Sequence, residues 1–95
     1  MGGWTTKRRL RRTSDRLRQL RTDLQVLDEQ RPYVVDEADD LDLRALVSDA
    51  PFDRHEAREA AGHAAAMMRQ RQHLLDQIAR LEAQQDRLLD RLGGG

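Results

Sequence analysis

The chain has 95 residues, of which 38% are hydrophobic, 3% aromatic and 36% charged, so it is too short and too polar to fill a thick globular core. It contains no cysteine, which excludes disulfides and thiolate metal sites and favours a cytoplasmic location, and it has no apolar run near the roughly 20 residues that span a bilayer. Basic and acidic residues balance at 17 each, so net charge by itself indicates neither a nucleic acid nor an acidic substrate.

Heptad spacing near the N-terminus predicts a first helix over about residues 5–30. Leucine and threonine side chains recur at alternating steps of four and three, which keeps them on one narrow helix face. Pro32 disfavours helical geometry at the residue before it, so we expect this helix to end near Gln30. The heptad residues of this helix are Thr6, Leu10, Thr13, Leu17, Leu20, Leu24 and Leu27.

The first predicted helix also carries a concentration of positive charge. Residues 1–31 hold nine basic and four acidic groups, a net charge of +5. Like charges stacked four residues apart repel, and each cation near a helix N-terminus is disfavoured by about 0.3–1 kcal/mol. Either carboxylates of a second, antiparallel helix neutralise this cluster, or an anionic partner such as nucleic acid or an acidic protein face does. The basic candidates for partner binding are Arg8, Arg9, Arg12 and Arg16, and the expected carboxylates are Glu82, Asp86 and Asp90.

Residues 31–52 are predicted to form an acidic connector that contains a short third helix. Apolar residues between about Asp36 and Val47 give an amphipathic pattern, and residues 32–56 carry a net charge of −6. Five carboxylates occur within seven residues, where the N-terminal arginines of the same hairpin cannot reach them. A solvated tip, a metal-chelating tip and a protein-docking tip are the alternatives. The acidic candidates for partner binding are Asp36, Glu37, Asp39, Asp40 and Asp42.

A second helix is predicted over about residues 53–92, followed by a glycine tail at 93–95. Asp53 and Glu56 match a capping box at its start. Arg71 and Gln85 interrupt its heptad series, and polar residues at such positions commonly fix register and oligomeric state. The heptad series is Ala57, Ala60, Ala64, Met67, Arg71, Leu74, Ile78, Leu81, Gln85, Leu88 and Leu92, and an extra apolar row beside it is Ala61, Met68, Leu75 and Leu89.

Together these patterns predict an all-α fold. We expect an antiparallel helical hairpin, or coiled coil, with a short third helix in the connector, forming one domain over residues 1–95. The apolar face of the second helix is wider than one partner helix covers, and the two charged regions have opposite signs. A two-fold homodimer would bury the extra row and bring opposite charges together. The alternative is a monomer in which the short helix covers that row.

The sequence offers no catalytic, cofactor or metal site. His55 and His73 lie about 27 Å apart along a helix and His63 points elsewhere, so no two of them can share a metal. Ser14 and Ser48 have no base at helical spacing, and no glycine-rich phosphate loop is present. Residues 1–6 match the short myristoylation template, which is the one indication of lipid anchoring. We therefore expect a non-enzymatic protein that needs no cofactor and no membrane.

The order of features along the chain has a counterpart in a known family. A basic first helix is followed by the Arg31-Pro32 step, a short helix and an acidic tip, and then by Glu-Ala-Ala-Gly-His-Ala-Ala at 59–65 and Ile-Ala-Arg-Leu-Glu at 78–82. This layout resembles the coiled-coil domain of Gre-type transcript-cleavage factors. The resemblance implies a regulator whose acidic tip enters the secondary channel of RNA polymerase and helps to hold a catalytic metal.

This chain departs from that family in two ways. The family's Asp-Leu-x-Glu-Asn tip motif and its second globular domain do not occur in these 95 residues, so Asp39, Asp40 and Asp42 inherit no role from it. Sixteen arginines against one lysine indicate a GC-rich coding sequence, and the chain also resembles small coiled-coil proteins of high-GC bacteria. The predicted function is a coiled-coil protein-interaction or assembly module. The alternatives are an RNA-polymerase-binding regulator with an acidic tip and a nucleic-acid-associated protein with a basic end.

Overall fold

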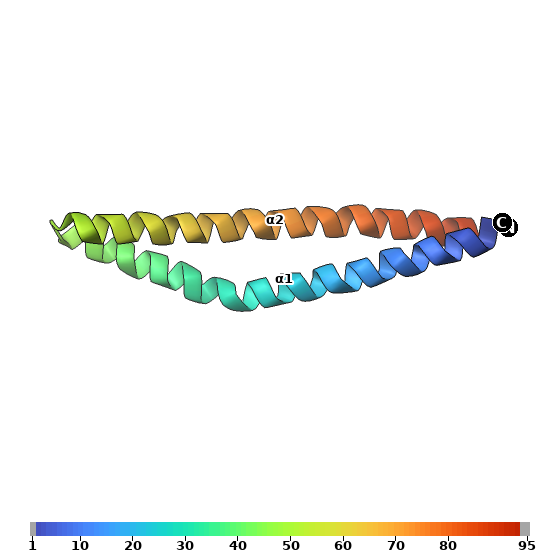
Figure 1. Cartoon of the computed structure of the whole chain (residues 1–95), viewed down its shortest axis with the longest axis horizontal. Coiled ribbons are helices and arrows are strands. Elements are labelled where there is room, and N and C mark those ends of the chain that lie inside the picture. The colour runs from blue at the N-terminus through green and yellow to red at the C-terminus, as the bar shows by residue number, and fades with distance from the viewer. Residues whose placement is uncertain (1, 94–95) are drawn as a thin grey trace. The chain divides into compact units, whose positions relative to one another are not determined.

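The computed structural model describes residues 2–93 as two long helices, α1 (Gly2–Val47) and α2 (Pro51–Gly93), joined by residues 48–50 (Figure 1). The all-α prediction is therefore confirmed. The helices form two compact units. Unit 1 combines α1 up to Leu24 with α2 from His73 onward, and unit 2 comprises Gln25–Gln72. Of the predicted glycine tail, Gly93 ends α2, and the last two glycines lie outside the described residues, as does Met1 at the start of the myristoylation template.

The prediction that the first helix ends near Gln30 and that a short third helix follows is wrong, because α1 continues through Pro32 to Val47. A proline inside a helix removes one backbone hydrogen bond and crowds the carbonyl four residues earlier, which costs about 3 kcal/mol. The heptad series runs through the proline without a break, however, and its burial offsets that cost. The series continues at Arg31, Val34, Ala38, Leu41, Ala45 and Ser48, all half-buried.

In unit 1 the two helical segments bury leucine and isoleucine side chains between them. Leu17 and Leu20 are the most completely buried, with 0% and 1% of their surface exposed. Leu74, Ile78 and Leu88 of α2 are buried as well. Across both units every residue of the two predicted heptad series is buried or half-buried, so these series are placed correctly by their spacing. The two series, together with the continuation of the first to Ser48, are called the seam from here on.

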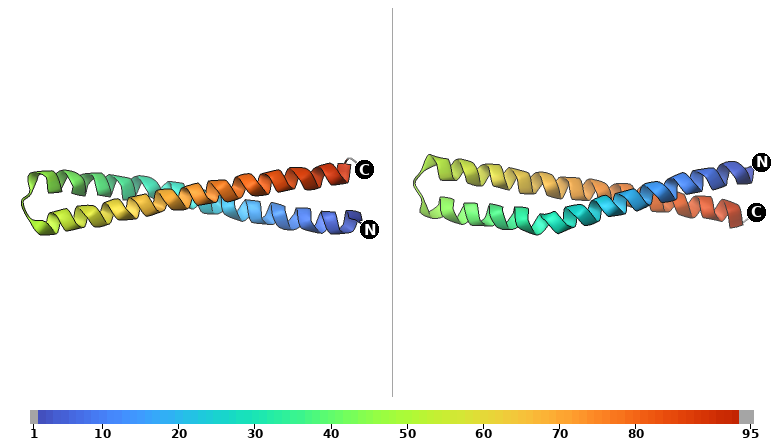
Figure 2. Two further views of the ribbon diagram at one scale, coloured as in Figure 1. Left: turned by 90° about the horizontal axis from the view of Figure 1, so that it is seen from above. Right: turned by 60° about the horizontal axis from the view of Figure 1, so that its bottom comes forward.

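Unit 2 contains the turn between the helices, and both views in Figure 2 show its two helical segments side by side. The Ser48 hydroxyl donates to the Asp53 carboxylate at 2.6 Å and accepts the Ala50 backbone N–H at 3.1 Å. The Ala50 carbonyl accepts the backbone N–H groups of Asp53 and Arg54. The second helix therefore begins at Pro51, two residues earlier than predicted, because proline at the first helical position lacks an N–H that would have no partner. Asp53 lies in the first turn rather than at the cap.

Candidate functional site

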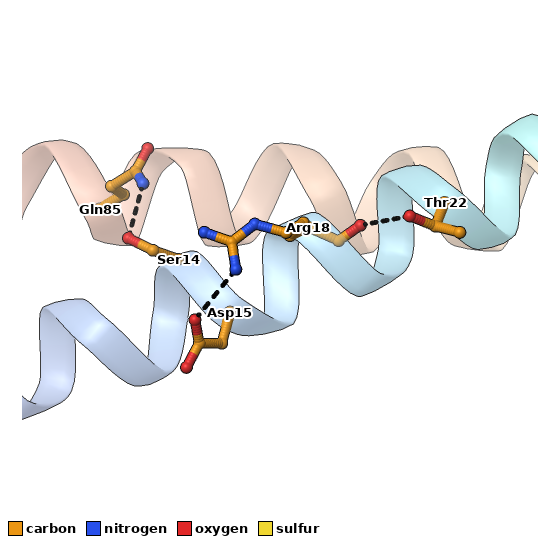
Figure 3. Close-up of polar contacts among 5 residues, drawn as sticks. All are labelled: Ser14, Asp15, Arg18, Thr22 and Gln85. Atoms are coloured by element: carbon orange, nitrogen blue, oxygen red, sulfur yellow. Dashed lines mark hydrogen bonds and ion pairs between the residues drawn. The ribbon is translucent and has the colours of Figure 1, made fainter.

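Polar side chains of the described residues also bond across the seam in unit 1. The Gln85 side-chain amide of α2 donates to the Ser14 hydroxyl of α1 at 3.0 Å, whereas Arg18 bonds to Asp15 within α1 (Figure 3). The second cross-helix pair joins Arg21 Nη2 to Glu82 Oε2 at 3.3 Å. From Ser14 to Arg21 the residue numbers rise along α1, whereas those of their partners fall along α2, from Gln85 to Glu82. Gln85 therefore interrupts the apolar series, as its sequence position indicated, with its side chain satisfied.

Unit 2 has a stronger polar pair at Arg71, the other interruption of the seam. Its guanidinium donates from Nε to Asp28 Oδ1 at 2.7 Å and from Nη2 to Asp28 Oδ2 at 3.4 Å. These hydrogen bonds hold the pKa of the Asp28 carboxyl below its ordinary value of 3.8 and raise the pKa of Arg71. The Arg31 guanidinium, 3.8 Å from Asp28 Oδ1, lowers the pKa of Asp28 further. The Asp28 carboxylate thus faces two arginines, Arg31 and Arg71, that both occupy seam positions.

The five acidic candidates lie on α1 in unit 2, and all are exposed. The structure does not gather them into one site. Glu37 lines a hollow with Glu56, Glu59 and His63 of α2, whereas Asp42 lines another hollow with Arg54 and Arg58. No group of three or more metal-ligating side chains within residues 2–93 is arranged to hold a metal ion. The geometry gives no support to a metal-chelating tip.

An exposed apolar cluster beside these carboxylates was missed by the sequence analysis. Its members are exposed by 63% to 88%, although they are large hydrophobic side chains. The heptad spacing could have indicated the three members on α1, because they fall between the heptad positions Leu41, Ala45 and Ser48 rather than on them. The cluster, called the turn surface from here on, consists of Leu43, Leu46 and Val47 at the end of α1 and Phe52 at the start of α2.

The four basic candidates lie on α1 in unit 1 and are also exposed. The predicted pairing of this cluster with carboxylates of α2 does not occur: Glu82 pairs with Arg21, and no ion pair among the described residues involves the four arginines, Asp86 or Asp90. Arg8 instead lies over the Trp4 ring, 5.5 Å from its centroid. Among the described residues of unit 1, these four arginines therefore have no carboxylate partner.

Neither α1 nor α2, over the residues described, has a stretch apolar enough to cross a membrane. No family model, curated protein or solved structure matches the chain. The surfaces described above are therefore the basis for assigning a function.

Proposed function

We propose that the chain is a non-enzymatic coiled-coil module that binds a partner protein through the turn end of unit 2. The observation that carries this proposal is the turn surface, where four large apolar side chains remain exposed although the seam has already buried the heptad residues. Exposed apolar side chains that gather in one place mark interaction sites, whereas single ones scattered over a surface do not.

The coiled-coil part of the proposal is supported by spacing and by contacts. Seam positions alternate in steps of four and three from Thr6 to Ser48 and from Ala57 to Leu92, and a strict heptad repeat of this length is typical of a coiled coil. The opposite numbering of the Ser14–Gln85 and Arg21–Glu82 pairs supports antiparallel helices.

The charge around the turn surface indicates the chemistry of the partner. Asp39, Asp40, Asp42 and Asp49 lie within a few residues of the apolar side chains, and all four are exposed. An interface with an apolar centre and a charged rim gains affinity mainly from the centre and encounter rate from the rim. The partner that fits is therefore a protein with an apolar depression bordered by lysine or arginine.

The test compares two variants that each remove two exposed apolar side chains. Leu46→Ser with Phe52→Ser alters the turn surface, and Val26→Ser with Tyr33→Ser alters exposed positions elsewhere on α1. Proteins captured by the wild-type chain from its native cell are identified by mass spectrometry, and affinities are then measured with the purified partner. Buried anchors contribute more than about 1 kcal/mol each, so the turn variant should bind at least about tenfold more weakly. Equal affinity of wild type and turn variant would refute the proposal.

A second comparison addresses the acidic rim. Replacing Asp39, Asp40 and Asp42 together with asparagine should leave helicity nearly unchanged, because all three side chains are exposed. It should slow association and reduce its dependence on salt. Capture of RNA polymerase as the partner would favour the polymerase-regulator alternative. The cytoplasmic location stays a prediction from the lack of cysteine.

A further inference from the structure

Six arginines lie on one flank of unit 1. On α1 they follow one another at steps of three and four, and on α2 at steps of seven and four, so each row stays on one side of its helix. All six side chains are exposed. The six residues, called the arginine face, are Arg9, Arg12 and Arg16 of α1 and Arg80, Arg87 and Arg91 of α2.

A surface hollow shows that the two rows meet on the same flank. Arg9 of α1 lines it together with Arg87 and Arg91 of α2, and the remaining lining residues are Gln84 and Leu88. Three guanidinium groups from two helices thus surround one depression that no carboxylate lines. This arrangement is repulsive within the molecule, and it is stabilised when an anion occupies the depression.

Two carboxylates of unit 1 have partners outside this face. Glu82 is held by Arg21 on the opposite flank, and Asp23, which continues the α1 row, accepts a hydrogen bond from Gln19 at 2.9 Å. None of the six arginines makes an ion pair with another described residue. Unit 1 as a whole holds eleven basic and six acidic residues, a net charge of +5.

We infer that the arginine face binds the phosphate backbone of double-stranded nucleic acid without regard to sequence. Guanidinium groups match phosphate oxygens in geometry and are only weakly hydrated. At about 1.5 Å per residue the α2 row from Arg80 to Arg91 extends roughly 16 Å, which is long enough for several phosphates. The site is separate from the turn surface and does not depend on the function proposed for it.

The composition of the face favours duplex nucleic acid over the alternatives. Binding of single strands relies on aromatic side chains that stack on bases, and the one aromatic residue of unit 1, Trp4, lies beneath Arg8 rather than on this face. An acidic protein partner would need an apolar centre for affinity. The apolar residue that lines the hollow, Leu88, is buried in the seam. Phosphate contacts are therefore the main interaction that the face offers.

The test measures binding of a fluorescent random-sequence DNA duplex by anisotropy over a series of salt concentrations. The face variant is Arg9→Gln, Arg87→Gln, Arg91→Gln. The matched control is Lys7→Gln, Arg11→Gln, Arg18→Gln, which removes the same charge from other sides of unit 1. Each lost phosphate contact lowers the salt slope by about 0.9, so the face variant should lose about 2.7 in slope, which corresponds to about 500-fold in affinity near 0.1 M salt. The control should lose less than about threefold, since screened charges away from the contact contribute little.

Three results would overturn the inference. The first is no measurable binding of duplex by the wild-type chain, and the second is equal loss in the two variants, which would indicate attraction by net charge alone. The third is tighter binding of single-stranded DNA or of poly-glutamate than of duplex at equal charge concentration. Far-UV circular dichroism of both variants establishes that helicity is retained, as expected for exposed side chains.

Discussion

The burial of Leu17 allows a quantitative test of the seam. Leu17→Ala removes three carbon atoms from a side chain with 0% exposure. At about 0.8 kcal/mol per buried carbon, the lost transfer free energy is about 2.4 kcal/mol, and the cavity left behind adds to it. For a chain of this length that loss lowers the melting temperature by roughly 10–20 °C. Urea and thermal unfolding followed by far-UV circular dichroism measure both quantities.

Leu43→Ala provides the matched control, because it removes the same atoms from the same helix at a residue that is 63% exposed. Substitutions at such positions usually change stability by less than about 0.5 kcal/mol. We therefore expect Leu43→Ala to be about as stable as wild type and Leu17→Ala to be much less stable than both. If both variants unfold at the same urea concentration, Leu17 does not lie in the seam and the assigned register is incorrect.

Two further predictions concern the charged pair and self-association. Because Arg71 lowers the pKa of the Asp28 carboxyl in the folded state, the pair stabilises the protein above the ordinary pKa of 3.8, and this contribution is lost as pH falls through the folded value. Thermal melts of Asp28→Asn should thus depend less on pH below about 4 than those of wild type; identical profiles would show that the pair contributes nothing. We also expect a homodimer that Leu89→Lys, at a residue 49% exposed, weakens strongly, and a sedimentation mass of 11.0 kDa for wild type at low and high salt would exclude it.

The seam could be predicted from the sequence because heptad spacing depends only on helical geometry. Leu17, Leu20, Leu74 and Ile78 were placed on buried faces by their spacing alone, and the structure buries all four. The polar interruptions were also identified, since Arg71 stands where an apolar residue is expected. Which residue would satisfy Arg71 depends on the relative axial position of two helices far apart in sequence. Asp28 could not be assigned to it from local patterns.

At residues 31–47 the long-range heptad pattern outweighs the local preference of proline to end a helix. Pro32 predicts a helix end, and this preference is real, but the steps of four and three continue through Arg31, Val34 and Ala38. Had the series been followed past Leu27, it would have predicted one helix to Ser48. The turn surface would then have followed as well, because Leu46 and Val47 cannot pack in the seam when Ala45 and Ser48 occupy it.

The polar pairs also determine which residues form the arginine face. A shift of α2 along α1 by one heptad moves it by about 10.5 Å and still places apolar residues opposite apolar residues. The same shift separates Arg71 from Asp28, Arg21 from Glu82 and Gln85 from Ser14, and leaving a partly buried arginine without its carboxylate is costly. Polar contacts therefore favour the observed register over its neighbours. Arg87 and Arg91 lie beside Arg9 only in this register, so the anion-binding depression depends on the register. The turn surface does not depend on it in the same way, because the covalent connection between the helices holds its residues close together.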